Sequence, residues 1–364
     1  MKAKLLALAT ALLLGTSAAQ AGVQLTVLEW EGYISLHEKE FEAYAKSKGK
    51  DIDLEFVRKP DGSILYIGNA DDIVQNLAAG KADLVTPTHN YYKQEQGKLL
   101  ALLAPVDTAK VENYADVYDV LRGLDAFKGT DGKVYGVPLL GGSYALAYNA
   151  AKASSPKSWS VLLDPANKGA YQITSDQFEA NVYQAALLAG VKADAVFDVE
   201  KMSPDQQAKT QDILNKLVAN AGGFWGGMPD KAAMKELRYV TDYWFGVAAA
   251  NAAGQKWAIP RTDEPVTVWL DTLAIAKQTA SDPEKMEAAH LLIGYLIGMQ
   301  AQQKTAEAFG SVIVNGKARA MMGSALPGDE FFDPALFWRP LSAKTRTAYR
   351  EMWDKALKAA GKST

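Results

Sequence analysis

Short β-rich runs alternate with amphipathic helices along the chain that follows the first 21 residues. Residues 24–30 predict a buried strand, and residues 37–48 predict a helix that ends at a glycine. A second strand is expected at 52–57, a helix at 71–79 and a third strand at 82–85. This alternation favours an α/β fold, in which a mostly parallel sheet is covered by helices on both faces.

Polar and aromatic clusters follow the first and third predicted strands. The first cluster is Glu29-Trp30-Glu31-Gly32-Tyr33, and the second runs from Thr86 to Tyr92. In open α/β sheets, ligands bind beyond the carboxyl ends of the strands. These two clusters are therefore candidates for a binding site.

The second half of the chain predicts a further lobe of the same class. A turn at 129–132 and a double glycine precede a strand at 144–148, where we expect the chain to leave the first lobe. The later elements are expected at 170–174 (strand) and at 178–189, 203–219, 282–309 and 342–360 (helices). We predict one lobe from 22–147 and 271–312, and another from 148–270 and 313–364. Several crossings between lobes make a hinge rather than a tether.

One segment of the predicted second lobe places two aromatic residues between glycine pairs. It runs from Gly222 to Gly227 and contains Phe224 and Trp225. It is either a mobile loop that carries a ligand-facing ring or an irregular connection, and the irregular connection is the interpretation that we favour.

The N-terminus has the pattern of a secretory signal peptide. Lys2 and Lys4 precede an apolar run, and Ala19-Gln20-Ala21 forms a cleavage site of small residues. Removing 21 residues from 364 leaves a chain of 343. The chain has no cysteine, so an exported protein of this kind is expected in a bacterial periplasm, without disulfides and without a lipid anchor. We therefore expect a periplasmic protein. The basic residues are dispersed along the chain, so we do not expect it to bind nucleic acid.

The residues that metal and nucleophilic chemistry require are scarce. The chain has three histidines, no pair of them at metal-ligand spacing, and no cysteine. Motifs of nucleophilic hydrolases, dinucleotide sites and phosphate-binding loops are missing. His89 is the histidine beside the candidate site, where a structural hydrogen-bonding role is the simpler interpretation. We expect neither a metal nor a cofactor, and no enzymatic activity.

The β-rich stretch from Val266 to Ile275 combines an aromatic ring with a carboxylate. Trp269 and Asp271 are two residues apart, so in an extended strand their side chains point the same way, roughly 7 Å apart. A ring beside a carboxylate suits an organic cation. On this stretch alone, an equally good interpretation is that Trp269 belongs to the core and Asp271 caps a turn.

Several segments together resemble the spermidine/putrescine-binding family of ABC importers, over nearly the whole mature chain. The matching segments are 28–33, 82–88, 135–138, 158–162, 168–169, Trp244 in its strand-end context, 269–275 and 309–315. The most specific of them is Trp-Leu-Asp-Thr-Leu-Ala-Ile at 269–275. The resemblance implies a two-lobed periplasmic binding protein fold of type II, with a hinge between the lobes.

The resemblance also implies which residues hold the ligand. In that family, aromatic rings enclose the methylene chain of the ligand and carboxylates pair with its ammonium groups. The positions implied here are Trp30, Glu31, Tyr33, Thr88, Asp176, Glu179, Trp244, Trp269, Asp271, Ser311 and Arg339.

Some of these positions depart from the family pattern and bear on the ligand. Gly32 stands where polyamine binders have a glutamate, Ser311 where they have a tyrosine, and Arg339 where they have a glutamine. A guanidinium near the site would favour a carboxylate, because arginine makes forked contacts to such groups. Alternatively, Arg339 turns away and pairs with Asp333 or Glu330.

The expected function is that of a monomeric periplasmic protein that binds a polyamine between its lobes and passes it to the membrane permease of an ABC importer. The alternatives are another small amine or a zwitterion such as an amino acid or betaine, a sugar, or a role as ligand-sensing partner of a membrane signalling protein. If the ligand is a sugar, Asp271→Asn is mild; if it is a cation, the same change causes a large loss of affinity.

Overall fold

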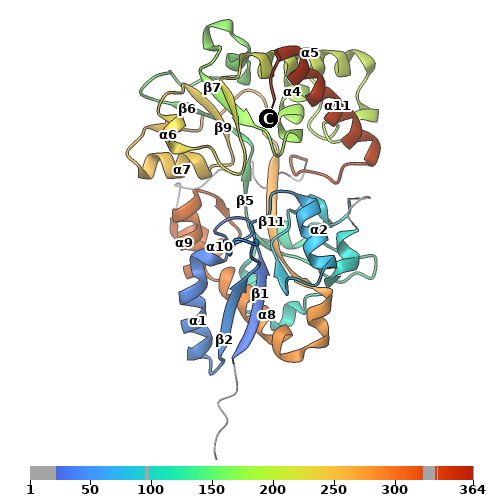
Figure 1. The fold of residues 1–364 in the computed structure, drawn as a ribbon, viewed down its shortest axis with the longest axis vertical. Helices are drawn as coiled ribbons and strands as arrows, with labels where there is room; N and C mark the ends of the chain where they lie inside the picture. Colours follow the sequence, from blue (N-terminus) through green and yellow to red (C-terminus); the bar gives the residue numbers. More distant parts are fainter. Residues whose placement is uncertain (1–21, 95–97, 323–332, 334, 364) are drawn as a thin grey trace, which may run out of the picture.

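The computed structural model describes residues 22–94, 98–322, 333 and 335–363. Within these residues the chain forms two sheets, one in each half of an elongated molecule (Figure 1). No described helix has the length and apolar character needed to cross a membrane. The signal peptide predicted for residues 1–21 lies outside the described residues.

The first sheet has seven strands in the order β12-β5-β11-β3-β1-β2, with β4 paired to β11. Its strands are β1 (Val23–Leu28), β2 (Ile52–Phe56), β3 (Leu84–Val85), β4 (Leu103–Ala104), β5 (Val137–Ser143), β11 (Val268–Ala276) and β12 (Val312–Ile313). β1 pairs in parallel with β2 and β3, as the alternating pattern predicts. The sheet is nevertheless mixed rather than mostly parallel, because β11 runs antiparallel to β3 and β5, and β12 is antiparallel to β5.

The second sheet has five strands in the order β10-β6-β9-β7-β8. Its strands are β6 (Ala145–Asn149), β7 (Tyr171–Thr174), β8 (Gly223–Trp225), β9 (Tyr239–Asp242) and β10 (Trp257–Ala258). β7 pairs in parallel with β8 and β9, whereas β6 is antiparallel to β9 and β10.

Helices cover both sheets. Around the first sheet they are α1 (Glu38–Ser47), α2 (Ala70–Ala78), α3 (Asp119–Arg122), α8 (Pro283–Leu296), α9 (Met299–Phe309) and α10 (Gly316–Met322). Around the second they are α4 (Glu179–Leu188), α5 (Pro204–Asn220), α6 (Lys231–Met234), α7 (Phe245–Ala252) and α11 (Ala343–Ala360). The C-terminal helix α11 packs against α5 and α4, so the chain ends on the second sheet's side. The residue boundaries predicted for the two lobes stay a prediction.

The segment from Gly222 to Gly227 is not an irregular connection. Its central residues form the edge strand β8, whose Ile173↔Phe224 register extends the parallel pairing with β7. A side chain at Gly222 would lie 2.4 Å from the carbonyl oxygen of Gly169, so only glycine permits this approach. Trp225 is buried, with its ring 5.5 Å from that of Tyr243.

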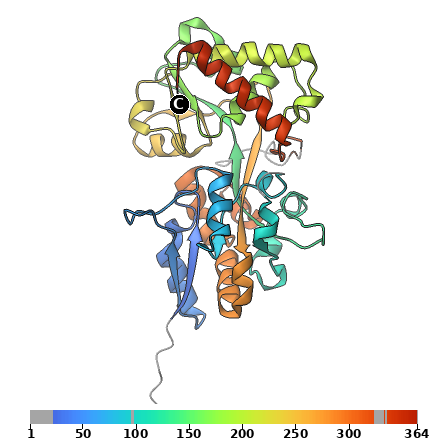
Figure 2. The same cartoon turned by 45° about the vertical axis from the view of Figure 1, so that its right-hand side comes forward.

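Three chain segments lie side by side where the two halves meet. β5 and β11 run along the long axis between the halves, and both views show them adjacent (Figures 1 and 2). β5 leads through Tyr144 directly into β6, and the N–H of Tyr144 donates to the carbonyl of Thr267 over 2.9 Å. The third crossing segment is residues 336–338. It pairs with the start of β11, since Val268 exchanges backbone hydrogen bonds with Leu336 and Trp338.

Candidate functional site

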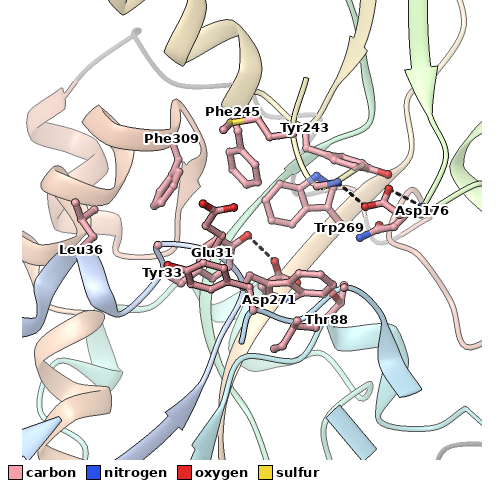
Figure 3. A pocket seen from close by; sticks show the side chains of 18 of the residues that line it. Glu31, Tyr33, Leu36, Thr88, Asp176, Tyr243, Phe245, Trp269, Asp271 and Phe309 are labelled. Atoms are coloured by element: carbon pink, nitrogen blue, oxygen red, sulfur yellow. Dashed lines mark hydrogen bonds between the residues drawn. The ribbon is translucent and has the colours of Figure 1, made fainter. Parts of the chain in front are cut away.

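A cavity of about 530 Å³ lies between the two halves of the molecule. Side chains from both sheets and their loops line it (Figure 3). Its aromatic residues are Trp30, Tyr33, Tyr66, Tyr243, Phe245, Trp269, Phe309 and Trp338. Its carboxylates are those of Glu31, Asp176 and Asp271.

The turn that follows β1 supplies Trp30, Glu31 and Tyr33. Gly32 adopts a positive φ of 85°, and a side chain added there would lie 3.1 Å from the Phe309 ring. The carboxylate of Glu29 is fully buried below this turn and accepts hydrogen bonds from the backbone N–H groups of residues 34 and 35. Glu29 therefore holds the turn in shape, while the carboxylate of Glu31 points into the cavity (Figure 3).

Asp271 is the most deeply buried carboxylate of the cavity wall. It is 4 % exposed, and its Oδ2 accepts a hydrogen bond of 2.8 Å from the Tyr33 hydroxyl. Its Oδ1 is buried and has no hydrogen-bond partner among the described residues. Burial raises the pKa of Asp271 to about 7, although the hydroxyls of Thr88 and Tyr33 favour its charged form. When it is ionised, a carboxylate buried in this way is stabilised by a cation beside it.

Asp176 stands on the opposite side of the cavity, after β7. Its Oδ1 accepts from the hydroxyl of Thr174 over 2.6 Å and from the backbone N–H of Gln177 over 2.8 Å. Its Oδ2 accepts from the N–H of Gly227 over 2.6 Å, which ties the loop after β8 to the site. Asp176 thus adds negative charge to the second wall and also holds that wall together.

The loop from β9 to α7 places Tyr243 and Phe245 in the cavity and turns Trp244 away from it. Trp244 has a φ of 81°, which is unusual for a residue other than glycine, and its Nε1 donates to the Ser143 hydroxyl over 3.1 Å. Asp242 fixes this loop, because its buried carboxylate accepts from the N–H groups of residues 243, 246 and 247. Burial raises the pKa of Asp242 to about 6.

The rings of this loop pack edge-on against Trp269. Ring centres lie 6.1 Å apart for Tyr243 and Trp269, and 5.5 Å apart for Phe245 and Trp269. Phe309 and Tyr33 extend the same cluster, since each of their rings contacts Phe245. The result is a continuous aromatic wall that spans both halves of the molecule.

The structure brings most of the residues implied by the sequence into this one cavity. Those that line it are Trp30, Glu31, Tyr33, Thr88, Asp176, Trp269 and Asp271. The strand geometry predicted for Trp269 and Asp271 is present in β11, where both face the cavity, with a register shift against β5 after Asp271.

Four residues of the predicted set lie outside the cavity wall. Trp244 is turned away by its left-handed backbone, and Ser311 is fully buried behind the wall. Glu179 lies in a smaller adjoining cavity, 3.9 Å from Arg346. Arg339 does not line the cavity, and among the described residues it forms no ion pair with Asp333; its Nη1 contacts the carbonyl of Asp194 at 3.5 Å. Glu330, the other partner considered for it, lies outside the described residues.

His89 has the structural role that its sequence context favoured. It is 2 % exposed, its Nε2 donates to the carbonyl of Trp338 over 2.7 Å, and its Nδ1 accepts from the N–H of Leu270. Burial lowers the pKa of His89 to about 4, so the ring is neutral at pH 7. It joins β11 to the third crossing segment.

Several cavity residues have no counterpart in the sequence prediction. They are Leu36, Tyr66, Met228, Tyr243, Phe245, Phe309 and Trp338. Tyr243 and Phe245 flank Trp244, and Phe309 is two residues before Ser311. The resemblance therefore identified these segments, but the residues that it implied differ by one or two positions from those that line the cavity. Tyr66, Met228 and Trp338 reach the cavity through long-range packing, which no local pattern records.

Comparison with known proteins agrees with this architecture. The model of the bacterial extracellular solute-binding protein family matches residues 41–329. The chain belongs to that family. It is accordingly a solute-binding protein of an ABC transporter, rather than an enzyme, and the resemblance drawn from the sequence is confirmed.

The similar proteins are named for, or were solved with, different small molecules. Spermidine/putrescine-binding periplasmic protein 1 of Haemophilus influenzae is 27% identical over 268 residues, which are 71% of this chain and 67% of that protein. The spermidine/putrescine transporter substrate-binding protein of Streptococcus pneumoniae has a TM-score of 0.71 at 16% identity, covering 93% of this chain and 100% of its own. AgtB of A. tumefaciens R10, solved with agropinic acid, has a TM-score of 0.65 at 16% identity and covers 93% and 99%.

These solved structures confirm the predicted two-lobed α/β binding-protein fold. At such low identity they carry the fold alone.

Proposed function

We propose that this protein binds an organic amine in the cavity between its lobes and delivers it to the permease of an ABC importer in the periplasm. The observation that carries the proposal is the composition of the wall. Eight aromatic rings and three carboxylates line it, and none of the described residues that line it is lysine, arginine or histidine. A wall of rings and negative charge favours cations over anions and neutral solutes.

The energetics of such a wall suit an alkylammonium ligand. A cation over a desolvated aromatic ring gains about 1 to 2 kcal/mol, and a charge-assisted hydrogen bond to a carboxylate contributes about 1.5 to 3 kcal/mol. Asp271, with its unpartnered Oδ1, is the residue to which we assign the ammonium group. Trp269, Phe245 and Phe309 are assigned to the carbon chain.

Binding is expected to close the lobes around the amine. Residues from both halves contact the cavity, so a ligand that touches both walls stabilises the closed arrangement over the open one. The three crossing segments provide the hinge for this motion. Polyamines are the class named for the Haemophilus relative, and they belong to the ligand class proposed here.

The proposal is tested by isothermal titration calorimetry on the mature chain with putrescine, spermidine, 4-aminobutanoate, glycine betaine and glucose. We expect at least one amine to bind and glucose not to bind. Asp271→Asn should lower the affinity for the amine by at least about tenfold, which corresponds to the loss of one charge-assisted hydrogen bond.

Asp212→Asn is the matched control, because Asp212 is an exposed carboxylate of α5 that does not line the cavity. Binding of glucose with unchanged affinity in Asp271→Asn would refute the assignment of an amine.

A further inference from the structure

A second cavity of about 190 Å³ adjoins the first. Asp176, Gln177 and Trp338 belong to the walls of both cavities. The smaller cavity, here named the side chamber, is therefore an extension of the main one. It offers room for the far end of a ligand whose amine lies beside Asp271.

Two arginines of α11 line the side chamber. Arg346 and Arg350 are four residues apart, so they share one face of the helix. Arg346 faces Glu179, with 3.9 Å between Nε and Oε1. The guanidinium carbon of Arg350 lies 3.7 Å from the centre of the Phe178 ring, and no described carboxylate is in ion-pair contact with it. Glu179 thus already faces a cation, and Arg350 keeps its donors available.

The other two carboxylates of the side chamber either accept hydrogen bonds from the protein already or are exposed to solvent. Asp176 accepts three hydrogen bonds from its own wall. Asp71 is exposed in the first turn of α2, where the helix N-terminus stabilises a negative charge. The side chamber therefore presents the guanidinium groups of Arg346 and of Arg350, which is partly open to solvent, as its charged donors.

The main cavity also has donors that no protein group satisfies. The Nε1 atoms of Trp30 and Trp269 and the hydroxyl of Tyr243 are buried and lack a hydrogen-bond partner among the described residues. An indole N–H can only donate, and so can an alkylammonium group. A plain polyamine therefore leaves these indoles unpaired.

From the guanidinium groups of the side chamber we propose that the ligand is an amine that also carries a carboxylate, such as an ω-amino acid. Its ammonium group lies beside Asp271 in the main cavity, and its carboxylate lies in the side chamber against Arg350 and Arg346. The planar guanidinium matches a carboxylate with two parallel hydrogen bonds. This inference rests on the proposed function, because the ammonium group bound beside Asp271 determines where the carboxylate at the other end of the ligand lies.

The test compares ligands that differ only at the far end. Calorimetry measures the Kd of each ω-amino acid of four to six carbons beside the diamine and the n-alkylamine with the same number of carbons. At the best-fitting length we expect the amino acid to bind at least about tenfold more tightly than its diamine. Arg350→Gln should remove that preference and leave the n-alkylamine unchanged.

Lys355→Gln is the matched control, since Lys355 is an exposed cation of the same helix outside the side chamber. Melting curves establish that both variants fold. Diamines that bind more tightly than the amino acids at every length, with Arg350→Gln indifferent to the carboxylate, would overturn this inference and leave the amine site standing. Binding of none of the three series would overturn the proposed function as well.

Discussion

The charge of Asp271 should make the ligand-free protein less stable as the pH rises. Its pKa is about 7 in the folded protein, against 3.8 for an unburied aspartate. Between these two values the folded state keeps the proton and the unfolded state releases it. The unfolded state then binds fewer protons, so the free energy of unfolding falls with increasing pH in this window.

The size of this effect follows from the pKa difference. Each pKa unit corresponds to about 1.4 kcal/mol, so the full penalty approaches about 4 kcal/mol above pH 7 and about 1.7 kcal/mol of it is present at pH 5. Asp271→Asn removes the titration but keeps an oxygen that can accept from Tyr33. We therefore expect the stability of Asp271→Asn relative to the natural protein to rise by about 2 to 3 kcal/mol between pH 5 and pH 8.

Urea unfolding of both proteins at several pH values, without ligand, measures this difference. Other buried carboxylates, such as Glu29 and Asp242, also have raised pKa values, but they are common to both proteins and cancel. Tyr33, Tyr91 and Tyr92 surround Asp271, and burial raises their pKa values, so they stay neutral across this range. Two stability profiles that run parallel from pH 5 to pH 8 would refute the reasoning.

The same ionisation should appear in binding. An ammonium ligand favours the charged carboxylate, so at pH 6 its binding releases up to one proton, and affinity improves by up to about tenfold per pH unit until pH 7. Calorimetry at pH 6 in two buffers of different ionisation enthalpy counts the protons. Release that persists in Asp271→Asn would assign it to another group.

Further changes test the walls of the cavity. Phe245→Leu should weaken amine binding by about two- to tenfold, because part of the apolar contact with the carbon chain of the ligand is lost, and an unchanged Kd would remove Phe245 from the site. Asp242→Ala should lower the free energy of unfolding by at least about 2 kcal/mol, because it leaves three backbone N–H groups without their acceptor; urea unfolding at pH 7 measures it, and full stability would contradict this role. Arg339→Gln should leave amine affinity within about twofold, since Arg339 contacts Asp194 outside the cavity; a larger change in Kd would place its guanidinium near the ligand.

The sequence predicted those elements that local patterns determine. The strand expected at 52–57 is β2 at Ile52–Phe56, and the helix expected at 203–219 is α5 at Pro204–Asn220, where Ser203 and Gln206 form a capping box. Hydrophobic periodicity and capping residues act over a few positions, so they are legible in the chain. Strand β8 was missed because its pairing with β7 joins segments some fifty residues apart.

The site shows the same division between local and long-range causes. Trp269 and Asp271 share the cavity because a strand alternates its side chains, which the sequence reveals. Trp244 was expected in the cavity because the family resemblance implied it, and its left-handed backbone, which brings its neighbours Tyr243 and Phe245 into the cavity instead, is not visible in the sequence. That turn is held by the carboxylate of Asp242, which accepts hydrogen bonds from three backbone N–H groups, and no residue pattern predicts this geometry.

The position of Asp271 links ligand charge to the hinge. Asp271 lies in β11, the strand that runs between the halves, at the point where its register with β5 shifts. β5 continues through Tyr144 into the second sheet, and the start of β11 pairs with the third crossing segment. A buried carboxylate at this junction destabilises the ligand-free protein when it is ionised, and an ammonium group relieves that cost only where both walls reach it. In the proposed function, an ammonium group that relieves this cost therefore contributes to the free energy that stabilises the closed lobes.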